Sequence, residues 1–115
     1  MNDEELLRNA ARAAGFVEPN SYREKTNSLL WISESGFPST WRPLDDNADA
    51  FDLMVNLSLF VFHGWTTSEG VALANVFVDN AEQTVPSGEI KGDEPHAATR
   101  RAIVRAAAQI GKDMK

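Results

Sequence analysis

Two apolar segments in the second half of the chain constrain its fold more than any other feature. Residues 57–63 and 70–78 are almost entirely apolar and are separated by a short stretch over 64–70. In the first segment, the face of the predicted strand that contains Leu59 is as apolar as the opposite face, which contains Phe60. A strand that is apolar on both faces is normally covered on both faces. We therefore predict a two-stranded hairpin with its loop over 64–70 and a layer of structure on each side.

Three further segments have the pattern of helices. Apolar residues recur at helical spacing over residues 3–14, 46–57 and 94–112. Asn2 stands three residues before Glu5, which is the spacing of a capping box, and Gly15 stands where a left-handed C-cap residue is needed. We predict three helices over these ranges.

The predicted second helix begins with acidic residues. Asp45 or Asp46 is expected to cap its N-terminus, because a side-chain oxygen there accepts hydrogen bonds from the first free amides. Pro95 is expected in the first turn of the last helix, which proline tolerates well. The inward face of the second helix is predicted to consist of Ala50, Phe51, Met54, Val55 and Leu57.

The remaining segments complete the predicted topology. Residues 28–33 form a short apolar run and are predicted as a strand, whereas 18–27 and 35–41 are expected to be irregular. Residues 79–93 are predicted as a long loop, with a minor edge strand near 89–90. The order is therefore α-β-α-β-β-α. We predict an α+β fold, a single domain over residues 1–115, built as a three-layer α/β/α sandwich with a small, mainly antiparallel sheet.

Charge and composition narrow the classes of function. The chain has 17 acidic and 11 basic residues, a net charge of −6, and no cysteine. Strongly acidic chains repel phosphate backbones, so direct binding to nucleic acid is not expected. The absence of cysteine excludes disulfides and thiolate metal sites. No apolar run approaches the roughly 18 residues of a membrane span, and the acidic N-terminus is unlike a secretory signal. We therefore expect a cytoplasmic protein without a membrane segment.

Neither a metal site nor a catalytic centre is predicted. The segment from Asp45 resembles a calcium loop in its first positions, but Ala50 replaces the required glycine and Asn56 the required glutamate. Helix capping explains these carboxylates better. The two histidines, His63 and His96, lack the close spacing of zinc ligands, and whether they converge in space is left open. No metal, cofactor or catalytic residue is expected.

Candidate contact residues come from the tryptophans and from the last helix. Trp65 lies in the predicted hairpin loop and Trp41 beside Arg42 in a turn, and aromatic residues near arginine are typical of binding hot spots. The alternative is that both rings close the edge of the core. Arg101 and Arg105 could hold a phosphate or carboxylate, because arginine binds such anions with two parallel hydrogen bonds. The alternative is an ordinary solvated helix face.

Three stretches resemble a family of small phage proteins. They are Leu30-Trp-Ile, the segment from Trp41-Arg-Pro-Leu to Phe51-Asp-Leu, and the alanine- and arginine-rich run over 94–107. Together they are similar to the phage and prophage αβα-sandwich family. The resemblance implies a sandwich fold and a phage or prophage setting in a host cytoplasm. It implies no catalytic residue, because the family has no established activity.

These observations lead to a function hypothesis with two alternatives. We expect a non-enzymatic phage-type accessory protein that acts by binding a macromolecule, with a protein partner favoured. A specific version of this hypothesis is an inhibitor of a host defence complex. In that reading the acidic surface formed by Asp45, Asp46, Asp49 and Asp52 occupies a basic groove of the complex, and charge complementarity speeds the encounter. The alternatives are a protein that binds or sequesters a small anionic ligand and an unrecognised hydrolase that uses His63 or His96.

Overall fold

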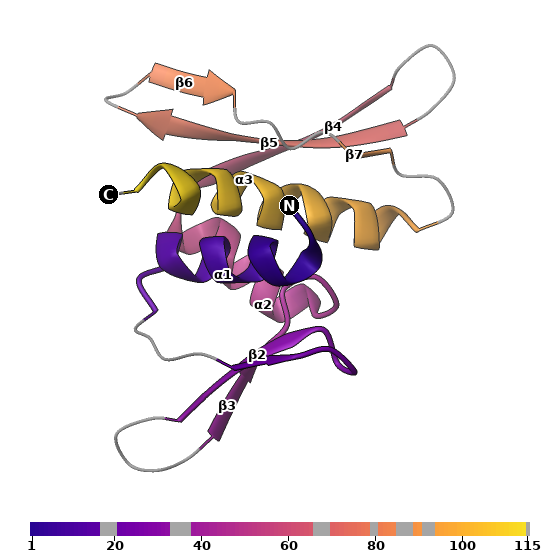
Figure 1. The fold of residues 1–115 in the computed structure, drawn as a ribbon. Coiled ribbons are helices and arrows are strands. Elements are labelled where there is room, and N and C mark those ends of the chain that lie inside the picture. The colour runs from indigo at the N-terminus through magenta and orange to yellow at the C-terminus, as the bar shows by residue number, and fades with distance from the viewer. Residues whose placement is uncertain are drawn as a thin grey trace.

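The computed structural model describes the backbone of residues 1–16, 21–32, 38–65, 70–78, 81–84, 89–90 and 94–114. Side chains are described for residues 1–16, 21–30, 39–61 and 94–114. Figure 1 shows the arrangement of three helices and two separate antiparallel sheets. The coarse prediction of an α+β fold with antiparallel strands is therefore confirmed. In the described part of the chain, no helix combines the length and apolar character needed to cross a membrane.

The three predicted helices are present close to their predicted bounds. They are α1 (Asp3–Ala13), α2 (Asn47–Asn56) and α3 (Pro95–Asp113). Asn2 Oδ1 accepts a hydrogen bond of 2.9 Å from the Glu5 amide, and Asp46 Oδ1 accepts one of 2.8 Å from the Ala48 amide. Both predicted caps are thus confirmed. Gly15 has φ +83°, as expected of a residue that ends a helix in the left-handed conformation.

The first sheet contains two strands that sequence patterning missed. Its order is β1 (Ser21–Arg23), β2 (Ser28–Ile32) and β3 (Pro38–Trp41), all antiparallel. Only β2 was predicted, and the expectation of irregular structure over 18–27 and 35–41 was wrong at β1 and β3. Both missed strands are short and largely polar, and they exist because the backbone of β2 offers partners on both edges.

The second sheet contains the predicted hairpin. Strands β4 (Leu59–Trp65) and β5 (Gly70–Val78) pair in register from Leu59 opposite Val76 to Trp65 opposite Gly70. The short strand β7 (Glu89–Ile90) pairs with β5, as predicted for an edge strand in the long loop. The strand β6 (Ala81–Thr84) was missed, because its polar sequence has no alternating apolar positions. The observed order is thus α-β-β-β-α-β-β-β-β-α.

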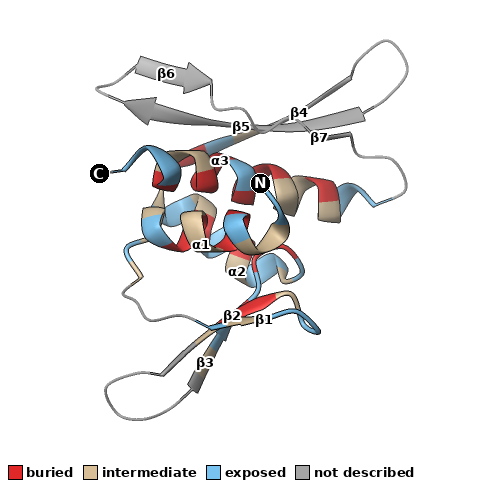
Figure 2. Cartoon of the chain, in the orientation of Figure 1, coloured by how far each residue is buried: buried red, intermediate tan, exposed pale blue. Residues whose placement is uncertain are grey.

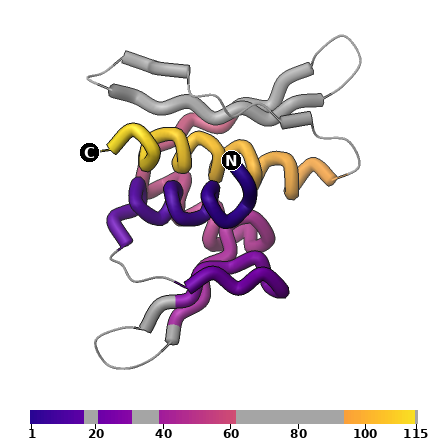
Figure 3. The backbone as a smooth tube through the Cα atoms, in the orientation of Figure 1, coloured from indigo at the N-terminus to yellow at the C-terminus, as the bar shows by residue number. Residues whose placement is uncertain are grey.

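The helices occupy the middle of the molecule. Figures 1 and 3 show α1 and α3 running side by side, with the second sheet beyond α3 and the first sheet on the opposite side of the helices. The described helices lie on one side of the second sheet. The predicted α/β/α order of layers stays a prediction, because it requires a second layer on the other face of that sheet.

The core forms where α3 meets its neighbours. Buried residues occur on several sides of α3 (Figure 2), as expected of a helix packed between layers. Its contact with α1 is close because small residues face each other there. A Cβ placed on Gly111 would lie 1.7 Å from the backbone oxygen of Asn9, so only glycine allows this approach. The buried residues of α3 are Ala98, Ala102, Ile103, Val104, Ala106, Ala107, Ala108 and Gly111.

The predicted inward face of α2 requires a correction. Ala50 is buried as predicted, but Phe51 and Val55 are 58% and 55% exposed, and Leu53 is buried instead. Met54 and Leu57 are half-buried against the core. The helix is rotated so that the stripe beginning at Ala50 faces inward, which carries the neighbouring stripe of Phe51 and Val55 outward.

Candidate functional site

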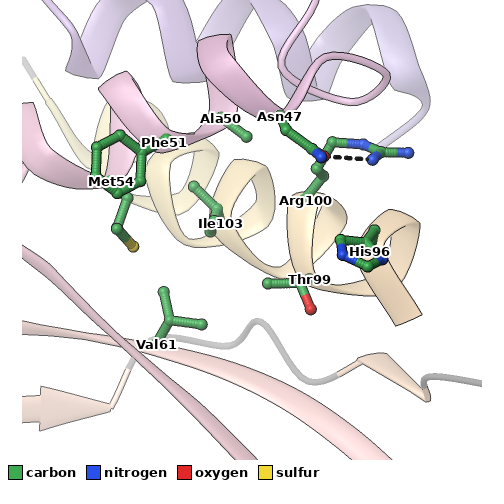
Figure 4. Close-up of a pocket in the computed structure, with 9 residues that line it drawn as sticks. All are labelled: Asn47, Ala50, Phe51, Met54, Val61, His96, Thr99, Arg100 and Ile103. Atoms are coloured by element: carbon green, nitrogen blue, oxygen red, sulfur yellow. Dashed lines mark hydrogen bonds between the residues drawn. The ribbon is translucent and has the colours of Figure 1, made fainter. Parts of the chain in front are cut away.

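A pocket of about 260 Å³ lies where α2, α3 and β4 meet. Figure 4 shows residues from all three elements converging on it. Ala50 and Met54 come from α2, Ile103 from α3 and Val61 from β4. Phe51 completes the apolar wall from the exposed side of α2. The pocket therefore presents hydrocarbon surface at the boundary between core and solvent.

The rotation of α2 explains why this pocket is open. Ala50 and Ile103 are 2% and 5% exposed, so they belong to the packed core beneath the pocket. Ala50 is small, and the larger Phe51 is displaced toward solvent. A phenyl ring at the inward position would occupy this volume. The same rotation that corrects the predicted inward face thus produces the cavity.

Polar side chains at one end of the pocket are already engaged. The Arg100 guanidinium donates to the Leu44 carbonyl oxygen at 2.8 Å and to Asn47 Oδ1 at 2.6 Å. The Thr99 hydroxyl donates to the Pro95 carbonyl oxygen at 2.8 Å. His96 lies at the same end and is exposed. Arg100 and Thr99 thus bind groups of the protein itself, and the wall formed by Ala50, Met54 and Ile103 is apolar.

The outer face of α2 extends the apolar surface. Phe51 and Val55 are one helical turn apart and therefore lie on the same side of the helix. Asp52 lies between them in the sequence and is exposed, as is Asp45 just before the helix. Together Phe51, Val55 and the pocket form an apolar surface beside acidic side chains, hereafter the α2 surface.

The four predicted aspartates divide into two pairs. Asp46 caps α2, and Asp49 Oδ2 accepts a hydrogen bond of 2.8 Å from the Arg42 amide. Both carboxylates therefore hold the local backbone. Asp45 and Asp52 have exposed side chains for which the described residues offer no hydrogen-bond partner. Of the four carboxylates, only this second pair has no described role in holding the backbone.

The two predicted tryptophan contacts have different outcomes. Trp41 is only 5% exposed, and its ring meets that of Phe16 edge to face with centroids 5.0 Å apart. It is a core residue, so its candidacy as a contact is corrected, and the alternative interpretation holds. The side chains of Trp65 and His63 lie outside the described residues, as does the question whether His63 and His96 converge.

The predicted anion-binding arginines are not organised as a site. Both terminal nitrogens of Arg101 donate to Asp3 Oδ1 at 3.1 Å, across 98 residues of sequence. This ion pair joins α1 to α3 and leaves Arg101 occupied. Arg105 is exposed and takes part in an interaction of its own. The ion pair weakens the anion-binding hypothesis for Arg101, which stays a prediction, because the guanidinium already has a carboxylate partner.

A second depression, of about 650 Å³, lies on the outer face of the first sheet. Arg23 and Arg42 line it, and so do Asp46 and Asp49. The mixture of charges weakens attraction for an anion, since a carboxylate beside an arginine competes with the ligand. This surface gives the small-anion alternative little support.

The ion pair of Asp3 belongs to a hydrogen-bonded chain that joins three elements. The Tyr22 hydroxyl donates to Asn27 Oδ1 at 2.7 Å, and Asn27 Nδ2 donates to Asp3 Oδ2 at 3.0 Å. Burial works to raise the pKa of Asp3, but the hydrogen bonds and charge of Arg101, with the Asn27 hydrogen bond, together lower it. Burial raises the pKa of Tyr22, and the charge of Asp3 adds to this effect.

Asp3→Asn is expected to destabilise the protein at neutral pH by about 0.5–1 kcal/mol, because the ion pair is partly exposed and screened by solvent. Since the folded state lowers the pKa of Asp3, its contribution is full above the pKa of the unfolded chain. The contribution is lost as pH falls through the folded pKa. Urea unfolding at pH 7 and pH 3 should therefore show the difference between variant and wild type shrinking at acid pH.

Glu5→Gln is the matched control for this prediction. Glu5 lies in the same first turn and carries the same charge, but no arginine partner is described for it. An Asp3→Asn effect no larger than that of Glu5→Gln, or one independent of pH, would contradict the assigned role of the ion pair.

Comparison with protein-family models, curated proteins and solved structures finds no match for this chain. The resemblance to the phage αβα-sandwich family thus stays an expectation from its short motifs. Within the described residues, no group of three acidic or histidine side chains could hold a metal ion. The candidate site therefore stands on its geometry alone.

Sequence reasoning placed some residues of this site and missed others. Phe51 and Met54 were assigned to the inward face of α2, whereas Phe51 lies at the opening of the pocket. Thr99 and Arg100 were not singled out. The apolar stripe through Ala50, Leu53 and Leu57 was the available signal, since it leaves Phe51 and Val55 on the next stripe.

Proposed function

We propose that this chain is a non-enzymatic binding protein that docks a protein partner on the α2 surface. The observation that carries the proposal is the apolar pocket beside Phe51, a phenylalanine that is 58% exposed. Large exposed aromatic residues beside a preformed apolar pocket are the usual anchors of protein–protein contacts. The polar groups of Arg100 and Thr99 are satisfied internally, so an apolar group can enter without leaving them unpaired.

The partner proposed has an apolar side chain flanked by basic groups. Asp52 is exposed and lies between Phe51 and Val55 in the sequence of α2, and the chain as a whole carries a net charge of −6. Complementary charge raises the rate of association, while the buried apolar contact supplies most of the affinity. The apolar side chain of the partner would fill the pocket, and its basic groups would lie near Asp52.

The biological setting of this proposal comes from the family resemblance. We propose a phage-type accessory protein acting in a host cytoplasm, with a protein of a host defence complex as partner. Occupation of a basic groove on that partner would block its nucleic-acid substrate. The α/β/α order of layers belongs to the same proposal, since it needs a further layer over the outer face of the second sheet.

Phe51→Asp is expected to weaken partner binding at least 30-fold, because a hot-spot aromatic contributes about 2 kcal/mol or more. The side chain is exposed, so the free energy of unfolding should change little. The experiment is affinity capture from host lysate, followed by titration of any retained protein with purified wild type and variant. A partner retained by the wild type and lost by Phe51→Asp supports the proposal.

Met114→Asp provides the matched control, because Met114 is 44% exposed and lies at the far end of α3. Asp52→Lys should slow association and weaken its dependence on salt, without disturbing the Asp46 cap. Asp46 and Asp49 are unsuitable for charge reversal because they hold the backbone around α2. Retention of the partner by Phe51→Asp at wild-type affinity, or no retained protein at all, would contradict the proposal.

A further inference from the structure

The strand β4 stands at the edge of the second sheet. It pairs with β5 along its whole length, whereas no described strand pairs with its other edge. Seven residues, Leu59–Trp65, thus present one row of backbone groups without a strand partner in the described part of the chain. Such an edge is a template for pairing with another strand.

This edge lacks the devices with which proteins usually protect exposed strands. Charged residues, proline and bulges block unwanted pairing. Residues 53–68 contain no Asp, Glu, Lys, Arg or Pro. The register between β4 and β5 is uninterrupted over all seven residue pairs, so no bulge twists the strand away.

The other sheet edges of the molecule differ from β4 in this respect. In the first sheet, β1 contains Arg23 and β3 begins with Pro38. In the second sheet, β6 contains Glu82 and β7 contains Glu89. The long strand β4 is therefore the one described edge strand that contains neither a charged residue nor a proline. This indicates that its free edge is used for pairing with another strand.

Burial at the start of β4 differs between its two faces. Leu59 is 7% exposed and Val61 packs against the core, whereas Phe60 between them is 46% exposed. Alternate residues of a strand lie on opposite faces, so Phe60 belongs to the face that points away from the helices. An exposed phenylalanine at an unprotected edge adds apolar area to any contact made there.

We propose that β4 pairs antiparallel with β4 of a second copy of this chain, joining the two second sheets into one. The β4 edge contains no charged residue, so two copies can approach along it although each chain carries a net charge of −6. An antiparallel pair of identical strands is self-complementary about a two-fold axis, the commonest symmetry of soluble oligomers. The joined order β6-β5-β4-β4-β5-β6 has an ordinary size for a sheet. The pairing uses the backbone edge of β4, whereas the α2 surface lies on the helix side of that strand, where Val61 lines the pocket.

The two-fold symmetry predicts which residue lies at the centre of the pairing. A two-fold axis perpendicular to the sheet keeps each face on the same side, so the central residue must oppose its own copy. The centre of Leu59–Trp65 is Phe62. Opposed residues of antiparallel strands have Cα atoms roughly 4.5–5.5 Å apart, a distance that a disulfide can span.

Single-cysteine cross-linking tests this pairing cleanly, because the chain contains no cysteine. Phe62→Cys is expected to form a disulfide-linked dimer under mild oxidation, with twice the 12.7 kDa mass of the chain. Lys112→Cys, at an exposed position of α3, is the control and should remain a monomer on non-reducing gels. Equal cross-linking of both variants would overturn the proposal.

Sedimentation of the wild type tests the proposal without any substitution that could itself change the fold. A dimer at micromolar concentration is expected, and a monomer at all concentrations up to several hundred micromolar would overturn the proposal. Phe60→Lys should weaken the dimer at least tenfold, since lysine is a typical edge-protecting residue. Phe51→Lys should leave the dimer unchanged, which separates this interface from the α2 surface.

Discussion

Gly111→Ala is expected to lower the free energy of unfolding by about 3 kcal/mol, although alanine is the better helix former. The added Cβ would lie 1.7 Å from the backbone oxygen of Asn9 and 3.2 Å from the amide nitrogen of Ala13. A backbone cannot turn aside as a flexible side chain can, so α1 and α3 must move apart. The cost of overpacking therefore exceeds the roughly 1 kcal/mol that alanine gains over glycine within a helix.

Gly15→Ala is the matched comparison for this prediction. Gly15 has φ +83° and no neighbouring atom within 4 Å of a built Cβ, so the same substitution there costs only backbone strain. We expect a loss of about 1–2 kcal/mol at this position. Urea unfolding followed by circular dichroism measures both. If Gly111→Ala were as stable as the wild type, the close approach of α1 and α3 would be contradicted.

Trp41→Ala is expected to lower the free energy of unfolding by about 4 kcal/mol, because it leaves a large cavity in the core. The ring is 5% exposed and lies against Phe16 at an interplanar angle of 88°. Such an edge-to-face pair adds about 0.5–1.5 kcal/mol to the burial of the rings. The melting temperature should fall by about 15 °C for a domain of this size.

Trp41→Phe and Phe51→Ala complete this experiment. Trp41→Phe keeps much of the buried ring and should lose less stability than Trp41→Ala. Phe51 is exposed, so Phe51→Ala should change the free energy of unfolding by no more than about 0.5 kcal/mol. Thermal unfolding of the isolated protein distinguishes the roles. A Trp41→Ala variant as stable as the wild type would return Trp41 to the candidate contact residues.

The candidate site shows which features cannot be predicted from the sequence. The α2 helix and its Asp46 cap were predicted, since both depend on neighbours within one turn. The inward face of α2 was predicted incorrectly only at Phe51 and Val55, because a ten-residue helix offers two adjacent apolar stripes. Packing against α3 and β4 chooses between them. The position of Phe51, on which the proposed function rests, follows from that choice.

The role of Arg101 shows the same limit over a longer distance. From its position on α3, Arg101 was predicted to take part in an anion-binding site. Asp3, its partner, lies 98 residues earlier in the chain, and no local pattern connects the two. Only the packing of α1 along α3 brings the carboxylate to the guanidinium.

The amino-acid sequence by itself determined the three helices, the N-terminal caps of α1 at Asn2 and of α2 at Asp46, and the β4–β5 hairpin. These features depend on hydrogen bonds and apolar periodicity within a few residues. Tertiary structure alone decided the strands β1, β3 and β6, the rotation of α2 and the partner of Arg101. Short polar strands exist only when another strand satisfies their backbone groups, and a helix faces inward only against the surface that it meets.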